Sequence, residues 1–168
     1  TGTATSPVMY KGNLIVQVGD DRGGKIIALD AKNGNEKWTW TGDGPGYASP
    51  VVIELERVPQ IVTMTDKSAV SVAADTGKLL WRLPWPDEWN ENIVTPVVAE
   101  TSSGKLLILS GVRRGTVALR ITRTGNTWEP IEEWRNADLT LYMNSPVLRE
   151  GKLYGMSSKQ RGQFFCLD

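Results

Sequence analysis

Residues 28–38 read ALDAKNGNEKW, and this stretch indicates the fold. The Asp30 side chain can accept hydrogen bonds from the backbone of a following turn, and Gly34 supplies the left-handed residue that closes a hairpin. Trp38 follows shortly after the glycine, where its ring can pack against a neighbouring structural unit. The stretch therefore predicts a tight turn between two antiparallel strands, with a tryptophan that packs beyond its own hairpin.

An internal repeat surrounds this stretch. A Ser/Thr-Pro-Val triplet occurs four times at intervals of about 45 residues, a period typical of repeat proteins. Short runs rich in β-branched residues follow each triplet and are separated by Gly, Asp, Asn and Ser, which is the pattern of strands joined by tight turns. The triplets are Ser6-Pro7-Val8, Ser49-Pro50-Val51, Thr95-Pro96-Val97 and Ser145-Pro146-Val147.

The repeat predicts an all-β fold. Each complete unit contains four strand-like runs, and four antiparallel strands form one blade of a β-propeller. We expect about four blades, which form part of a ring of about seven or eight. A single propeller segment is predicted over residues 1–168, with blades at about 5–41, 48–83 and 94–134 and an incomplete blade at 144–168.

The hairpin stretch resembles the signature A-x-D-x-x-T-G-x-x-x-W of pyrroloquinoline-quinone (PQQ) repeats, with asparagine in place of threonine in the first copy. Later copies keep the Thr-Gly pair and a tryptophan, although the third contains an insertion that leaves either Trp128 or Trp134 at the tryptophan position. The family includes quinoprotein dehydrogenases and the BamB-like propeller lipoproteins that help to assemble outer-membrane proteins. The resemblance assigns structural roles to Asp30, Gly34, Trp38, Gly77, Trp81, Gly125 and Trp134.

The length of the chain suits only part of such a ring. At about 45 residues per blade, seven or eight blades need over ~300 residues, whereas this sequence has 168. We therefore expect an excerpt of a longer protein. The alternative is a homodimer in which two copies complete one ring.

Composition narrows the function classes. The chain has 19 basic and 19 acidic residues, which argues against an electrostatic grip on nucleic acid. It has no histidine and one cysteine, so His-containing catalytic triads, HExxH zinc sites and CxxCH haem attachment are excluded. No apolar run is long enough to span a bilayer. No catalytic, cofactor-binding or metal-binding residue is predicted.

A candidate partner-binding face is formed by loops. In an up-and-down blade, the turns between second and third strands emerge on the same side as the connections between blades. Basic residues at these turns predict a surface for an acidic peptide or anionic ligand, unless they are only solvated hairpin residues. Two tryptophans on the acidic loop after residue 83 are candidate anchors, unless they pack locally over the blade edge. The candidates are Arg22, Lys67, Arg113, Arg114, Lys159, Arg161, Trp85 and Trp89.

Two other motifs point to a site less specifically. The Gly-rich segment Gly42–Tyr47 precedes a predicted strand, not a helix, so it lacks the context of a phosphate-binding loop. The pair Asp20-Asp21 offers carboxylates to a hard cation, but a calcium site needs six to eight oxygen ligands. We interpret the first as a connection between blades, and the second does not define a calcium site.

The resemblance leaves alternative functions open. The favoured hypothesis is a non-catalytic protein-binding or scaffold module of the bacterial cell envelope, without a cofactor, in the periplasmic or extracytoplasmic location that the family implies. The alternative is part of a PQQ- and calcium-dependent quinoprotein alcohol or sugar dehydrogenase whose active site lies outside this chain. Such enzymes characteristically carry a vicinal Cys-Cys pair, whereas Cys166 has no neighbouring cysteine. A sensor ectodomain is a further possibility.

Overall fold

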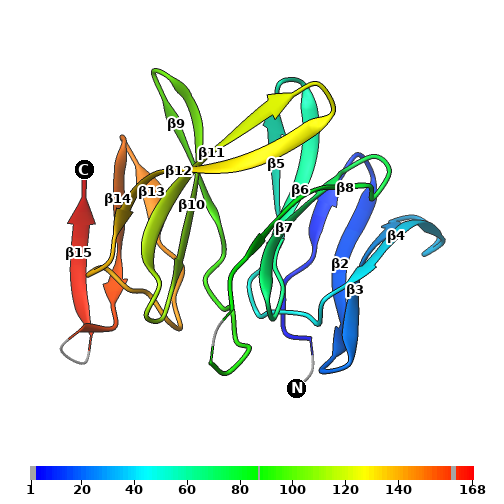
Figure 1. The fold of residues 1–168 in the computed structure, drawn as a ribbon. Coiled ribbons are helices and arrows are strands. Elements are labelled where there is room, and N and C mark those ends of the chain that lie inside the picture. The colour runs from blue at the N-terminus through cyan, green and yellow to red at the C-terminus, as the bar shows by residue number, and fades with distance from the viewer. Residues whose placement is uncertain (1–2, 87, 160–161) are drawn as a thin grey trace. The chain divides into compact units, whose positions relative to one another are not determined.

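Four antiparallel β-sheets make up the structure (Figure 1). The computed structural model describes residues 3–86, 88–159 and 162–168, and no α-helix forms among them. In every sheet the strands follow one another in chain order, joined by turns. This arrangement confirms the predicted all-β fold of antiparallel blades.

Three sheets have four strands and the last has three. The first sheet contains β1 (Val8–Tyr10), β2 (Asn13–Asp20), β3 (Gly23–Asp30) and β4 (Glu36–Gly42), and the second contains β5 (Val51–Leu55), β6 (Val58–Met64), β7 (Ser68–Ala73) and β8 (Leu79–Pro84). The third contains β9 (Val97–Thr101), β10 (Gly104–Gly111), β11 (Gly115–Thr124) and β12 (Thr127–Asn136). The fourth contains β13 (Val147–Arg149), β14 (Lys152–Ser157) and β15 (Gln163–Leu167).

The chain divides into two compact units. Unit 1, Thr1–Asn92, contains the first two sheets, and unit 2, Ile93–Asp168, contains the last two. Within unit 1 the first strands of the two sheets, β1 and β5, contact each other, and within unit 2 β9 contacts β13. Adjacent sheets in each unit thus meet at their first strands, as neighbouring propeller blades do.

The Ser/Thr-Pro-Val triplets reinforce these first-strand contacts. In unit 1 the backbone N–H of Ser6 donates to the hydroxyl of Ser49 at 3.0 Å, and in unit 2 the N–H of Thr95 donates to Ser145 Oγ at 3.1 Å. Each bond links one triplet to the next along the chain. The hydroxyl in the triplet therefore joins neighbouring sheets, which gives a physical reason for its recurrence.

The hairpin of residues 28–38 has the geometry that its sequence suggests. Gly34 is left-handed, with φ of +76°, and its N–H donates to the Asp30 carbonyl at 2.8 Å. The Asp30 carboxylate accepts the Lys32 N–H at 2.9 Å and lies 3.0 Å from Lys37 Nζ. These contacts, the Lys32 bond first, hold the pKa of Asp30 below its ordinary value. The turn is thus bonded through both backbone and side chain.

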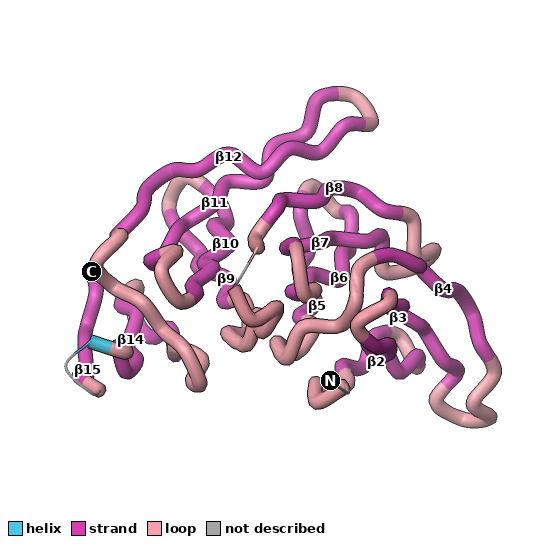
Figure 2. Tube along the Cα trace, turned by 60° about the horizontal axis from the view of Figure 1, so that its bottom comes forward, coloured by secondary structure: helices cyan, strands magenta, loops and turns pink. Residues whose placement is uncertain are grey.

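The repeat tryptophans share one place in their sheets. Between third and fourth strands the register shifts by one residue, and the residue just before each shift faces a tryptophan: Ala28 faces Trp38, Ser71 faces Trp81, and Ala118 faces Trp134. The third sheet reaches this register through a longer β11–β12 hairpin, which extends beyond the other strands of its sheet (Figures 1 and 2). The register therefore places Trp134, and not Trp128, at the repeat position.

Trp38 joins the two sheets of unit 1. Its indole N–H donates to the carbonyl of Ala74 in the second sheet at 3.0 Å. A Cβ atom added to Gly77 would lie only 2.5 Å from the indole ring, so the ring packs directly on the turn of the neighbouring sheet. Trp38 and Ala74 belong to one buried core, whose members are Ile15, Ile26, Ala28, Trp38, Ile61, Val70, Val72 and Ala74.

Unit 2 has its own core, and Trp134 lies outside it. Ala99, Leu106, Ile108, Ala118 and Leu153 form that core. Trp134 is 37% exposed and borders an apolar groove of about 180 Å³ between the third and fourth sheets. Its ring therefore lacks the enclosure that Trp38 has, although the two residues occupy equivalent positions in their sheets.

Candidate functional site

Four loop segments of unit 1 come together at one end of its sheets. They are the β2–β3 turn, the β4–β5 connection, the β6–β7 turn and the segment after β8. The structure describes the last segment at residues 85–86 and 88–92. We call these four segments the loop cluster. The N–H of Asp66 donates to the Gly44 carbonyl at 2.9 Å, and the N–H of Trp85 donates to the Lys67 carbonyl at 2.8 Å. Within unit 1, the turns between second and third strands thus lie at the same end as the connections that follow the fourth strands, as predicted.

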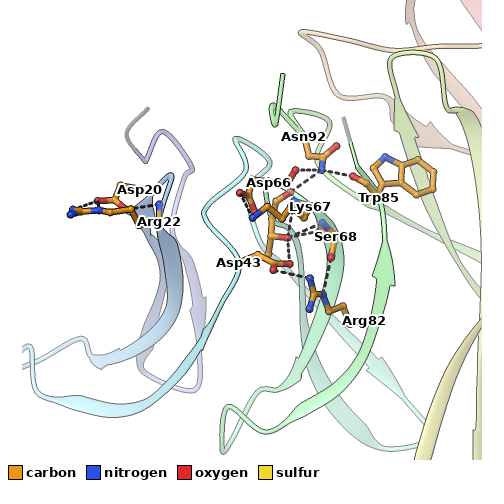
Figure 3. Close-up of polar contacts among 10 residues, drawn as sticks. Asp20, Arg22, Asp43, Asp66, Lys67, Ser68, Arg82, Trp85 and Asn92 are labelled. Atoms are coloured by element: carbon orange, nitrogen blue, oxygen red, sulfur yellow. Dashed lines mark hydrogen bonds and ion pairs between the residues drawn. The ribbon is translucent and has the colours of Figure 1, made fainter. Parts of the chain in front are cut away.

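Asn92 holds three of these segments together (Figure 3). Its buried side-chain amide donates to the carbonyls of Thr65 and Trp85, each at 2.8 Å. Its backbone carbonyl accepts the N–H groups of Tyr47 at 2.9 Å and Ala48 at 3.0 Å. One residue therefore satisfies backbone groups of the β4–β5 connection, the β6–β7 turn and its own segment.

A charged network lies beside this residue. Arg82 donates from Nη2 to Asp43 Oδ1 at 2.7 Å and from Nε to Ser68 Oγ at 2.8 Å (Figure 3). Thr65 Oγ1 lies 3.0 Å from Asp43 Oδ2 and accepts the Ser68 N–H at 2.9 Å. The network fixes the β6–β7 turn against the β4–β5 connection.

Asp66 is the unusual member of the loop cluster. Its side chain lines a cavity of about 60 Å³ bordered by Asp20, Asp21, Gly44, Pro45, Asp66, Lys67 and Asn90. The residue is only 6% exposed, and Oδ1 has no hydrogen-bond partner among the described residues. Burial raises the pKa of Asp66, and nearby Asp43 adds to the rise, whereas Lys67 and Arg82 oppose it. A buried, poorly satisfied carboxylate therefore faces a small polar cavity.

The predicted basic residues have acidic neighbours. Arg22 pairs with Asp20 at 2.6 Å, Lys67 Nζ lies 3.8 Å from Asp66 Oδ2, and Lys159 pairs with Asp138 at 2.9 Å. These neighbours offset the positive charge on which the expectation of an anionic ligand was based. The pair with Arg22 lowers the pKa of Asp20, and the pair with Lys159 lowers that of Asp138.

The remaining basic candidates belong to unit 2. Arg113 lies in the β10–β11 turn with φ of +58°, and the Arg114 carbonyl accepts a hydrogen bond from Arg135. Arg161 lies outside the described residues. The structure therefore brings Lys67 to the cavity in unit 1 and pairs Arg22 with Asp20 at its border, while Arg113, Arg114 and Lys159 lie in unit 2.

The two loop tryptophans behave differently. Trp89 is 52% exposed, as expected of a residue that contacts a partner. Trp85 is only 3% exposed, so of the two alternatives left open by the sequence its burial favours local packing over an exposed anchor. The hydrogen bonds of its backbone N–H to Lys67 and of its carbonyl to Asn92 tie its backbone to the β6–β7 turn and to Asn92.

Sequence reasoning missed Asn92 and the site role of Asp66. Neither belongs to the repeat signature, and each bonds to another loop, Asn92 to Thr65 and the Asp66 N–H to Gly44, so spacing along the chain gave no signal. The described residues contain no group of three or more His, Cys, Asp or Glu side chains arranged to hold a metal ion. In the described part of the chain, no helix has the length and apolar character of a membrane span.

We predict that Asp66→Asn stabilises the fold at neutral pH. Burial raises the pKa of Asp66 in the folded state above its value in the unfolded state, so the folded state binds the proton more tightly. The free energy of unfolding therefore falls as pH rises from the unfolded-state pKa through the folded-state pKa. Removing the charge should raise the free energy of unfolding by about 1 kcal/mol at pH 7. Urea unfolding as a function of pH measures this, and the gain should disappear below the ordinary pKa of aspartate. An equal gain at every pH would contradict the charge explanation.

Comparison with known proteins gives the family. A sequence model described as "Outer membrane protein assembly factor BamB" matches residues 1–168. No curated protein sequence matches the chain.

Solved structures share the fold. BamB from Moraxella catarrhalis is similar with a TM-score of 0.64 and 16% identity, over 98% of this chain and 49% of that one. Quinohemoprotein alcohol dehydrogenase from Comamonas testosteroni is similar with a TM-score of 0.55 and 17% identity, over 70% of this chain and 26% of that one. The chain thus spans about half the length of the first and about a quarter of the second. The family match over the whole sequence shows that this chain belongs to the BamB family of PQQ-repeat propeller proteins.

Proposed function

We propose that this chain is a non-catalytic propeller segment that binds other proteins in the bacterial cell envelope, through the loop cluster of unit 1. The observation that carries the proposal is the match of an outer-membrane assembly factor family to the entire sequence. An extracytoplasmic location follows from the same family. Protein binding, not catalysis, is the role that the name of this family suggests.

The loop cluster suits such a role. Buried hydrogen bonds from Asn92 hold its backbone, and Arg82 links the side chains of Asp43 and Ser68, so little conformational freedom is lost when a partner binds. Its rim exposes the side chains of Trp89, Lys67 and Arg22. A rigid rim with an exposed tryptophan and charged groups is typical of protein-binding surfaces.

The dehydrogenase alternative fits these residues less well. Similarity to the quinohemoprotein enzyme, at 17% identity, concerns the fold alone. The exposed Cys166 lies between Phe165 and Leu167, so it does not supply the vicinal cysteine pair of those enzymes. Addition of PQQ with calcium distinguishes the alternatives, because a saturable change in quinone absorbance would favour the enzyme.

Site-specific photo-crosslinking tests the binding surface. We expect a photoreactive amino acid at position 67 or 89 of the protein, expressed in bacteria, to form adducts with an envelope protein that mass spectrometry can identify. The matched control is position 32, which is exposed in the β3–β4 turn at the other end of its sheet. Adducts at positions 67 and 89 alone support the proposal. Identical adducts at all three positions, or none at positions 67 and 89, would contradict it.

A further inference from the structure

We propose that the cavity beside Asp66 binds the basic side chain, arginine or lysine, of the partner protein. The inference rests on the proposed function, since it names the chemistry that the partner must present to the loop cluster. It is carried by a buried carboxylate that lines a cavity of the right size, with an excess of acidic groups around it.

The first step is the unsatisfied carboxylate. Asp66 Oδ1 is buried and has no hydrogen-bond partner among the described residues. A buried charged group normally obtains a partner, because its lost hydration must be replaced. Lys67 Nζ is 3.8 Å from the other oxygen, beyond hydrogen-bond distance, and about half of its side chain faces solvent. Because Oδ1 is itself screened from solvent, a donor entering the cavity would pair with Oδ2, the oxygen that lies nearest Gly44 and Lys67.

The second step is the charge around the cavity. Its border carries the carboxylates of Asp20, Asp21 and Asp66 but only one ammonium group, that of Lys67. Arg82 is engaged with Asp43 and Ser68, and Arg22 is paired with Asp20, so the border together with Arg22 carries three carboxylates against two cations. The cavity therefore favours a cation over an anion, which is opposite in sign to the ligand that the sequence suggested.

The third step is the size and access of the cavity. A cavity of about 60 Å³ is larger than one water molecule needs, since on this measure a single water requires roughly 10–15 Å³. The space can therefore admit the head group of a side chain. Gly44 keeps the space open, since an added Cβ would lie 3.0 Å from Asp66 Oδ2 and 2.7 Å from the Asp20 carbonyl oxygen.

The acidic lining and the exposed tryptophan are compatible with one protein ligand. Arginine and lysine head groups donate several hydrogen bonds to carboxylates, and these bonds strengthen where water is excluded. Trp89, next to Asn90 in the chain, is exposed beside this border and offers apolar surface to the rest of the partner. We therefore assign the cavity to a basic side chain that projects from a polypeptide.

The test is a titration followed by amide chemical shifts in NMR spectra. The probes are acetyl-Gly-Arg-Gly-amide, acetyl-Gly-Lys-Gly-amide and the uncharged acetyl-Gly-citrulline-Gly-amide. We expect one or both cationic peptides to shift the amides of Gly44, Asp66 and Lys67 saturably, and the citrulline peptide to leave them unchanged. Asp66→Asn should weaken the binding at least fivefold. The control Asp75→Asn, which removes an exposed carboxylate paired with Lys11, should leave binding unchanged.

Other outcomes would overturn the inference. Equal shifts with the citrulline peptide, or unchanged affinity in Asp66→Asn, would show that charge at this cavity does not determine binding. Shifts caused by calcium chloride but by neither cationic peptide would assign the cavity to a metal ion. If the peptides fail while crosslinks form at positions 67 and 89, the binding surface stands and only its basic-side-chain chemistry is wrong.

Discussion

Replacing Trp38 by alanine is expected to lower the free energy of unfolding by about 3–5 kcal/mol, the range for large aromatic residues in cores. The change removes the indole that packs on Gly77 and leaves the buried Ala74 carbonyl without its donor. It also opens a void between the two sheets of unit 1. Urea unfolding, followed by the fluorescence of the remaining tryptophans, measures the loss.

Trp89→Ala is the matched control for Trp38→Ala. The same side chain is removed, but from a residue that is half exposed on the loop cluster. We expect a change within about 0.5 kcal/mol, as for most surface substitutions. Similar losses in both variants would show that Trp38 does not join the sheets as described.

Asn92→Ala should destabilise unit 1 by about 2–4 kcal/mol, because the carbonyls of Thr65 and Trp85 lose a shared donor inside the protein. Alanine keeps the backbone carbonyl that accepts the N–H groups of Tyr47 and Ala48, so the loss of stability measures the contribution of the Asn92 side chain alone. Thermal and urea unfolding measure the stability. Hydrogen exchange should also accelerate in the β6–β7 turn, whose backbone depends on this amide.

Asn33→Ala provides the comparison for Asn92. Asn33 is exposed and accepts only the N–H of Asn35 within its own turn at 2.9 Å. Water can replace that bond, so we expect a change of about 0.5 kcal/mol or less. A loss for Asn92→Ala no larger than this would mean that the loop cluster is not held by its side chain.

Local signals in the sequence predicted the blades well. The Asp30 to Trp38 pattern encodes a turn whose contacts lie mostly within a few residues, so spacing alone indicates its geometry. The proline-containing triplets recur with the repeat, and each of them leads directly into the first strand of a sheet.

The loop cluster was harder to predict. Asn92 and Asp66 acquire their environment from loops that are distant in sequence, and burial of a carboxylate leaves no mark on the residues beside it. Trp85 shows the same limit: the sequence left open whether this residue is an exposed anchor or packs locally, and only the structure shows that it is buried. The sign of the favoured ligand changed because the acidic partners of Arg22 and Lys67 became visible only in the structure.

The most direct test of the account is photo-crosslinking from position 89 in an Asp66→Asn background, with Asp75→Asn as the parallel control. The Asp66 variant is expected to be at least as stable as the parent at pH 7, so loss of binding cannot be attributed to unfolding. The account predicts that the envelope adduct seen in the parent is strongly reduced in Asp66→Asn and retained in Asp75→Asn. An adduct of undiminished yield in Asp66→Asn would contradict the claim that this carboxylate binds the partner.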